Sequence, residues 1–206
     1  MHVTFMCIAI PTIFCSDKLQ LHLFFNDLLV TPALNNFFKY ITYIGDGAFI
    51  LLLAFLLLFI NVQKSLTIIS CYLISAGFTQ GIKYAFFGDA DRPSLVFEIK
   101  HIPLKLIEDV DLNIHHSFPS GHTTAAFSLF FCLSFFSKNN VLQFIYFTSA
   151  LLVAFSRVYL SQHFFEDITV GSLIGVVFSL LVCYILYETK ITSTLNKLQK
   201  PIWRLF

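Results

Sequence analysis

Ionisable side chains are sparse in this sequence, and one set of them stands at the edges of long apolar stretches. A charge at the middle of a membrane helix costs on the order of 3 kcal/mol, so such groups are expected to serve a function. The set contains Lys83, His122, Arg157, His163 and Asp167. Together with Arg92, from the polar connection after residue 87, it comprises three cations, two histidines and one acid. Because arginine guanidinium groups match the oxygens of tetrahedral anions, these residue types predict an oxyanion site.

The segment Pro119-Ser120-Gly121-His122 adds a second signal, because it precedes an apolar stretch and has the features of a helix start. Ser120 is a favourable N-cap residue, and the free amide groups of a first helical turn attract an anion. Gly121 lets an oxyanion approach the backbone closely because it has no side chain. We therefore expect Ser120 and Gly121 to share the anion with the cations.

Asp167 follows His163 by four residues, so the two side chains lie on one helical face. A carboxylate in that place can orient an imidazole and stabilise its charged form. Three cations, a helix N-terminus, two histidines and one acid describe a site for phosphoryl transfer that needs no metal.

The composition predicts what holds these residues in place. Apolar residues make up 57% of the 206 residues and charged residues 12%, whereas soluble domains usually carry about 25% charged residues. The sequence therefore predicts an all-α integral membrane protein. The formal net charge of +1 gives no indication of nucleic-acid binding.

The apolar stretches predict about six membrane helices in one domain, residues 1–206. Residues 1–16 predict a short or tilted first helix, since Val3 to Cys15 is short for a span and lacks the basic start and cleavage site of a signal peptide. Residues 19–40 predict an interfacial amphipathic segment, in which Thr31-Pro32 starts a helix. The helical core is expected over 44–187, followed by a cytoplasmic basic tail, 188–206. The clearest spans are predicted at 44–60, 66–87, 121–137, 141–160 and 164–187.

Basic residues in short connections predict the orientation. Lys64, Lys138 and the tail lie on one side, which we expect to be cytoplasmic. The long connection over residues 88–120 has more acids than bases and lies on the other side, facing the periplasm or exterior of a cell (inner) membrane. This topology brings the chemical residues to the outer helix ends.

Three segments in order resemble the signature of the type 2 phosphatidic acid phosphatase family. They are Lys83-YAFFGDAD-Arg92-Pro93, Pro119-Ser120-Gly121-His122 and Ser156-Arg157-VYLSQ-His163-FFE-Asp167. Eight residues separate Lys83 from Arg92, where the family usually has six; the other two segments match fully. The resemblance covers roughly residues 20–187.

The resemblance implies a six-helix core and a two-step reaction through a phosphohistidine. It implies that His163 is the nucleophile, that Asp167 orients it, and that His122 transfers protons. The implied phosphate ligands are Lys83, Arg92, Ser120, Gly121 and Arg157. The expected substrate is a membrane lipid phosphate or diphosphate, with undecaprenyl diphosphate, phosphatidic acid, phosphatidylglycerophosphate and lipid A phosphate as candidates. No cofactor is expected.

Two other functions remain open from the sequence. The same pocket could hold vanadate for haloperoxidase chemistry, as in soluble proteins with this signature, although the hydrophobic spans argue against it. A transporter or channel could line its path with charged groups, but here these groups gather at one end.

Two further groups of residues have weaker signals. His101, His115 and His116 lie with Glu98, Asp109 and Asp111 in the long connection, but without the spacing of a metal motif, so contacts to solvent or to a lipid headgroup are favoured. The five cysteines stand singly in apolar stretches and are interpreted as small apolar membrane residues.

Overall fold

The computed structural model describes residues 1–27, 31–188 and 198–204, and within these ranges the chain forms helices and no strand. The α-helices are α1 (His2–Cys15), α2 (Lys18–Asp27), α3 (Pro32–Ile41), α4 (Gly47–Leu58), α5 (Val62–Phe86), α6 (Pro93–Ile99), α7 (Gly121–Phe136), α8 (Asn140–Tyr159) and α9 (Phe165–Glu188). Short 3-10 helices are η1 (Thr42–Gly45) and η3 (Ile202–Arg204).

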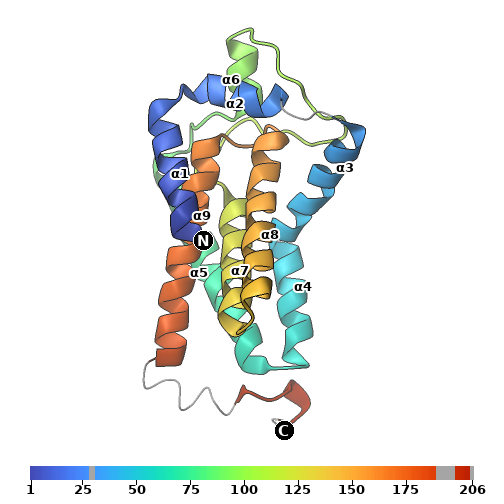
Figure 1. Ribbon diagram of the computed structural model, residues 1–206, viewed down its shortest axis with the longest axis vertical. Coiled ribbons are helices and arrows are strands. Elements are labelled where there is room, and N and C mark those ends of the chain that lie inside the picture. Colours follow the sequence, from blue (N-terminus) through green and yellow to red (C-terminus); the bar gives the residue numbers. More distant parts are fainter. Residues whose placement is uncertain (28–30, 189–197, 205–206) are drawn as a thin grey trace.

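Long helices run beside one another and form an elongated bundle (Figure 1). Helices α5, α7, α8 and α9 make its centre, α4 packs against α5, and α1 lies along the upper part of α9. Helix α2 lies across the upper end, and α6 stands above it with the rest of the long connection. The prediction of an all-α integral membrane protein is confirmed.

The number of membrane spans does not follow directly from the bounds of the helices, because several helices are short or bent. Among the described residues, α5, α8 and α9 are long and apolar enough to cross a membrane. The pair α3–η1 and α4, bent by 58°, makes a fourth if it counts as one broken span. Helices α1 and α7 are apolar but have only 14 and 16 residues. A total of six stays a prediction.

The helix ends follow from local sequence. Side chains of Thr31, Asp46, Asn61, Ser120 and Asn139 cap α3, α4, α5, α7 and α8 by accepting hydrogen bonds from first-turn amides. These caps satisfy donors that would otherwise have no partner at an apolar helix start. The observed bounds of α4, α5, α7, α8 and α9 consequently differ from the predicted ranges by at most four residues.

Helices α7 and α9 pack closely because α9 presents two glycines one turn apart. A Cβ atom added at Gly171 would lie 2.7 Å from the Ser120 carbonyl oxygen, and one added at Gly175 would lie 2.5 Å from that of Thr124. Glycines at this spacing let membrane helices approach closely, where packing and not the hydrophobic effect holds them together. The contact sets the position of the α7 N-terminus against the start of α9.

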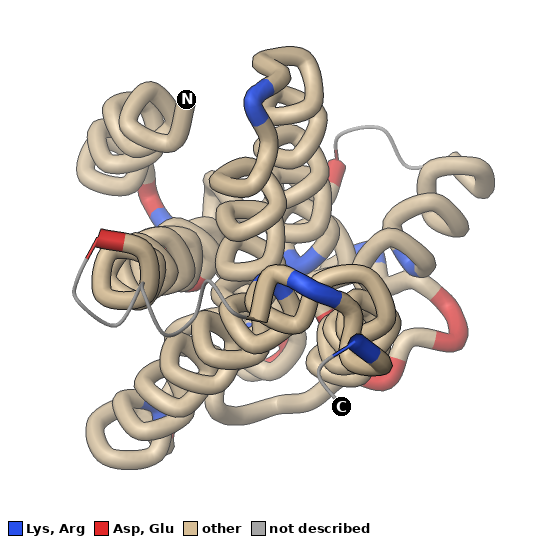
Figure 2. The backbone as a smooth tube through the Cα atoms, turned by 90° about the horizontal axis from the view of Figure 1, so that it is seen from below, with Lys and Arg blue, Asp and Glu red and all other residues tan. Residues whose placement is uncertain are grey.

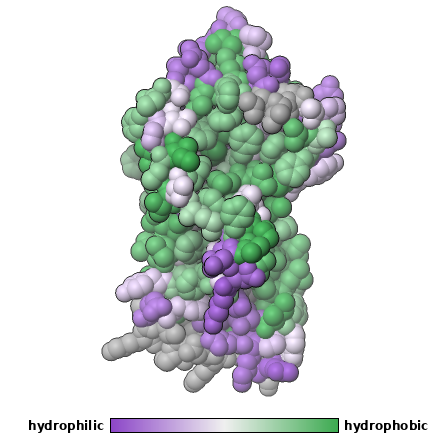
Figure 3. Space-filling view, viewed as in Figure 1, coloured by the Kyte–Doolittle hydropathy of each residue, from purple (hydrophilic) through white to green (hydrophobic). Residues whose placement is uncertain are grey.

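The surface divides along the bundle axis. Hydrophobic residues cover the middle of the face in Figure 3, with hydrophilic residues gathered above and below. Most of the tube in Figure 2 is tan, since charged residues are few along the helices. At the lower end the amide of Val62 donates to the carbonyl oxygen of Lys200 at 3.1 Å, and the Lys64 ammonium lies 5.4 Å from the Phe136 ring centroid. Lys200 of the basic tail therefore lies at the same end of the bundle as Lys64. Lys190 and Lys197 lie outside the described residues.

The connection over residues 88–120 is more ordered than a polar loop. It contains α6, which begins at Pro93, a residue favoured in the first helical turn. Phe97 of α6 is fully buried and lies 5.4 Å from the His22 ring of α2, measured between ring centroids. The connection and α2 thus cover the upper end of the bundle together.

The close contact at Gly175 predicts that an added methyl group there destabilises the protein, whereas one at Gly77 does not. Gly175→Ala should lower the thermal unfolding midpoint by several degrees, because overpacking costs about 1–3 kcal/mol. Gly77→Ala on α5 is the matched control, since nothing lies within 4 Å of its added Cβ and alanine favours the helix. Midpoints of both variants in detergent check this, and equal midpoints would exclude close packing at Gly175.

Candidate active site

The sequence-predicted residues come from different elements and meet at the upper end of the bundle. Lys83 is in the last turn of α5, Arg92 lies immediately before α6, and Arg157 is in the last turn of α8. Ser120 caps α7, and Gly121 and His122 follow it. His163 lies between α8 and α9, and Asp167 is in the first turn of α9. Their arrangement therefore depends on helix packing at one end.

Three cations are buried together with little opposite charge. The exposed fractions are 6% for Lys83, 8% for Arg92 and 8% for Arg157. Buried cations are costly unless an anion accompanies them, and Asp167 is the acid whose charge acts on both Lys83 and Arg92. A second carboxylate, Asp46, acts on Arg157. Two carboxylates against three cations still leave an excess of positive charge, which a multivalent anion would balance.

Asp167 connects the parts of the site. Its Oδ2 atom accepts hydrogen bonds from Ser117 Oγ at 2.5 Å, from the Phe164 amide at 2.9 Å and from His163 Nδ1 at 3.3 Å. Its carbonyl oxygen accepts from the Ser120 amide at 3.1 Å. One residue thereby fixes the imidazole, the turn before α9 and the cap of α7.

One ring nitrogen of His163 is held by a hydrogen bond, and the other is available. Nδ1 is used by Asp167, and no partner for Nε2 is found among the described residues. Burial lowers the pKa of His163 well below its usual value, and the positive charges of Arg92, Arg157, Lys83 and His122 lower it further. The ring is therefore neutral near pH 7, and a neutral Nε2 has the lone pair that nucleophilic attack requires.

The first turn of α7 presents free amide groups beside these charges. Ser120 is fully buried and its Oγ accepts hydrogen bonds from the Thr123 amide at 3.4 Å and the Thr123 hydroxyl at 3.0 Å. A Cβ added at Gly121 would have Gln80 Nε2, 3.8 Å away, as its nearest neighbour. The backbone at Gly121 is consequently open to an anion, as expected for a helix N-terminus.

The two arginines are anchored on one side and free on the other. Arg92 donates from Nε to the His115 carbonyl oxygen at 2.9 Å and from Nη1 to Gln162 Oε1 at 2.9 Å. Burial lowers the pKa of Arg92 and the negative charge of Asp167 raises it, but a guanidinium stays protonated. Arg157 donates from Nη1 to Thr42 Oγ1 at 2.7 Å, while its buried Nε has no partner among the described residues. That unpaired donor is suited to an oxyanion.

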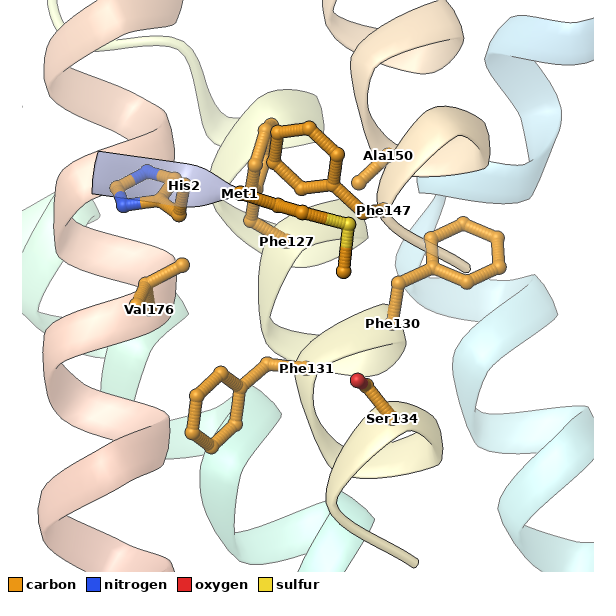
Figure 4. Close-up of a pocket in the computed structure, with 9 residues that line it drawn as sticks. All are labelled: Met1, His2, Phe127, Phe130, Phe131, Ser134, Phe147, Ala150 and Val176. Carbon is orange, nitrogen blue, oxygen red and sulfur yellow. The ribbon is translucent and has the colours of Figure 1, made fainter. Parts of the chain in front are cut away.

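A polar cavity of about 420 Å³ leads to the cations. Its lining comprises Gln80, Lys83, Tyr84, Arg92, Asn113, Ile114, His115 and His116. The apolar cavity in Figure 4, of about 180 Å³, lies elsewhere, where Met1 and His2 meet phenylalanines of α7 and α8. None of the predicted site residues lines that apolar cavity. Lys83 and Arg92 line the polar one, and Asp167 lines a further cavity of about 340 Å³ together with Ser117.

The extra residues between Lys83 and Arg92 are absorbed at the end of α5. The Phe87 amide closes the helix on the Lys83 carbonyl oxygen, and the Ala90 amide closes a turn on that of Phe87. Both cations remain buried despite the longer spacing. The longer spacing is therefore compatible with a buried position for both cations.

Sequence reasoning missed a layer of residues that supports residues 160–164, the connection between α8 and α9 that contains His163. His22 and Asn26 of α2 are buried and lie 3.3 Å and 3.4 Å from Ser161 Oγ. Burial lowers the pKa of His22 to about 4, so it is neutral; the Asp167 charge raises this pKa and the Lys18 charge lowers it. Ser161 itself has a φ of 52°. Polar residues spaced four apart in α2 were the available signal, but their partner is 135 or more residues away.

The histidines of the long connection do not gather with its acids into a metal site. His115 pairs with Asp91 at 2.9 Å, and Asp109 pairs with Lys39 at 3.2 Å. In the described part of the chain, the grouping of metal-ligating side chains within mutual reach is instead formed by cysteines. His115 and His116 line the polar cavity, which suits contacts to a headgroup.

Fold and site define an integral membrane helical bundle with a buried cationic site and a histidine–aspartate pair at one end. A sequence model described as the PAP2 superfamily matches residues 64–191. The chain belongs to this superfamily, and the resemblance seen in the three sequence segments is confirmed.

Two solved structures have similar folds. LpxE of Aquifex aeolicus has a TM-score of 0.67 and 28% identity, covering 80% of this chain and 93% of its own. A transmembrane PAP2-type phosphatidylglycerolphosphate phosphatase from Bacillus subtilis has a TM-score of 0.65 and 21% identity, covering 92% of this chain and 96% of its own. A search of curated protein sequences found no match.

The Asp167 network predicts that Ser117 positions the carboxylate. Ser117→Ala should lower kcat about 10- to 100-fold with little change in KM, because a hydrogen bond to a charged group contributes about 1.5–3 kcal/mol. Ser94→Ala is the control, since the buried Ser94 hydroxyl has no partner among the described residues. Steady-state phosphate release on both variants measures this. An unchanged kcat for Ser117→Ala would remove Ser117 from the network.

Proposed function

We propose that this protein removes a phosphate group from a membrane lipid phosphate or diphosphate through a phosphohistidine at His163. The observation that carries this proposal is the His163–Asp167 pair, buried to 2% and 1% exposure, with Nε2 unpartnered beside three cations. Superfamily membership supports the same chemistry. The haloperoxidase and transporter alternatives have no specific observation in their favour.

In the first step, the lone pair of His163 Nε2 attacks phosphorus and the bond from phosphorus to the lipid oxygen breaks. The phosphate that enters brings negative charge beside His122, which allows this imidazole to carry a proton and to give it to the leaving oxygen. Asp167 accepts the Nδ1 hydrogen bond and stabilises the positive charge that develops on the ring. The products of this step are a dephosphorylated lipid and phosphohistidine.

In the second step, water attacks the phosphohistidine. His122 takes a proton from that water, the nitrogen–phosphorus bond breaks, and inorganic phosphate leaves with His163 neutral again. Proton transfer of this kind contributes about 10²–10⁴-fold. Each histidine returns to its starting state, so the cycle is complete.

Charge on the phosphoryl oxygens is balanced by Lys83, Arg92, Arg157 and the α7 N-terminus. Phosphoryl transfer has a loose transition state with charge spread over three equatorial oxygens, so its catalysis consists mainly of positioning and electrostatic stabilisation. The unpaired Arg157 Nε and the open backbone at Gly121 support this assignment. The cations take the role that a metal ion has in other phosphatases.

The substrate is a lipid whose headgroup enters through the polar cavity while its chains stay in the bilayer. Undecaprenyl diphosphate, phosphatidic acid, phosphatidylglycerophosphate and lipid A phosphate remain the candidates, and the activity printed for the Bacillus subtilis structure favours testing phosphatidylglycerophosphate first. We place the site on the periplasmic or outer side of a cell membrane, because Lys64 and the basic tail lie at the opposite end.

Phosphate release from these lipids should proceed without magnesium and persist in excess chelator. His163→Ala should abolish turnover, a fall of at least about 10³-fold given the nucleophile's role. His101→Asn is the matched control, because His101 has a φ of 54°, which asparagine tolerates. A colorimetric phosphate assay on purified protein measures each rate. Activity retained by His163→Ala, or lost with the chelator, would contradict the proposal.

A further inference from the structure

Three of the five cysteines converge in the interior of the bundle. Cys71 of α5, Cys132 of α7 and Cys183 of α9 have Sγ atoms that all lie within 4.8 Å of one another. Their exposed fractions are 0%, 0% and 1%. The sequence gives no hint of this, because each cysteine stands alone in its own apolar stretch. Cys7 and Cys15, in contrast, are exposed.

The surroundings of the three thiols are apolar. Ile50, Ala54, Ile68, Leu129 and Val182 are buried in the same cluster. The Cys71 thiol lies 3.8 Å from the Ser179 carbonyl oxygen, a weak contact at a helix interior. Within the described residues, no carboxylate or imidazole completes the group. A set of sulfur donors without hard oxygen ligands selects soft metal ions and disfavours magnesium or calcium.

The spacing suits three sulfurs around one ion. Metal–sulfur bonds of about 2.3 Å place three sulfurs of a planar site about 4 Å apart. The largest separation of 4.8 Å therefore has to shrink by less than about 1 Å. Three donors from three helices are also held in position by the bundle, so a small rotamer change suffices.

The net charge of the complex favours a monovalent ion over a divalent one. An apolar interior penalises net charge strongly. A copper(I) ion that displaces one proton from one of the thiols forms a complex with no net charge, with the other two thiols as neutral donors. A divalent ion would require the loss of two protons, and loss of all three would leave excess negative charge with either ion. Binding thus releases one proton and involves no change of oxidation state.

We propose that Cys71, Cys132 and Cys183 form a binding site for a soft monovalent cation of the copper(I) type. The site is separate from the proposed phosphatase site, because Cys132 follows His122 by ten residues on α7, or about 15 Å at 1.5 Å per residue. An ion there joins α5, α7 and α9, the same helices that carry Lys83, His122 and Asp167 at their upper ends.

The test uses full-length protein with Cys7→Ser and Cys15→Ser as the parent, so that exposed thiols do not contribute. The reduced protein in detergent is titrated anaerobically with copper(I) against a chromogenic copper(I) chelator. We expect one copper ion retained per chain, a higher unfolding midpoint with copper, and X-ray absorption that reports sulfur neighbours at about 2.3 Å. Cys132→Ala in the parent should retain no copper.

Several results would overturn the proposal. They are no copper retained by the parent, retention unchanged in Cys132→Ala, or X-ray absorption with nitrogen or oxygen neighbours. Counting thiols with an alkylating reagent under denaturing conditions tests whether two of the cysteines form a disulfide. The parent should show three reactive thiols without reductant. A count of one, rising to three after reduction, would mean that two cysteines are bonded to each other and would also overturn it. The X-ray absorption and thiol counts use the parent alone, so they stand even if Cys132→Ala fails to fold.

Discussion

A single buried carboxylate organises the upper end of this molecule. Asp167 is 1% exposed, and a buried charge is tolerated only when hydrogen bonds and opposite charge compensate its lost hydration. Its Oδ2 atom accepts from Ser117, Phe164 and His163, and its carbonyl oxygen accepts from Ser120. The long connection, the loop after α8 and the start of α7 are therefore all tied to the first turn of α9.

The bundle supports this carboxylate through close helix contact. Gly171 and Gly175 bring α9 against α7 so closely that a methyl group at either position would meet a carbonyl oxygen. Gly45 at the end of η1 also packs closely, because an added Cβ would lie 2.6 Å from Val153 Cγ1 and 2.8 Å from the His122 carbonyl oxygen. These glycines thus determine the positions of the α7 amide groups and of the histidines. The cations from α5, the long connection and α8 surround them. The position of the charged groups at the upper end consequently depends on the packing of the apolar helices that carry them.

Much of this could be predicted from sequence, because it depends on local patterns. Lengths of apolar stretches gave the helices, N-cap residues gave the starts of α3 and α7, and the four-residue spacing gave the His163–Asp167 pair. The remainder depends on distant contacts. Nothing local indicates that Ser117 donates a hydrogen bond to Asp167, that His22 contacts Ser161, or that cysteines in α5, α7 and α9 converge. The number of spans also stays open, since α1 and α7 are short and α3–α4 is bent.

The proposed mechanism requires that the transferred phosphate becomes covalently bonded to His163 during turnover. Rapid quenching during turnover of a lipid substrate labelled with ³²P in the transferred phosphate, followed by peptide mapping, detects this bond. We expect a phosphoenzyme that is stable in alkali, labile in acid and located on His163, and that is absent from His163→Ala. Label on another residue, or full turnover with no phosphoenzyme at any quench time, would contradict it.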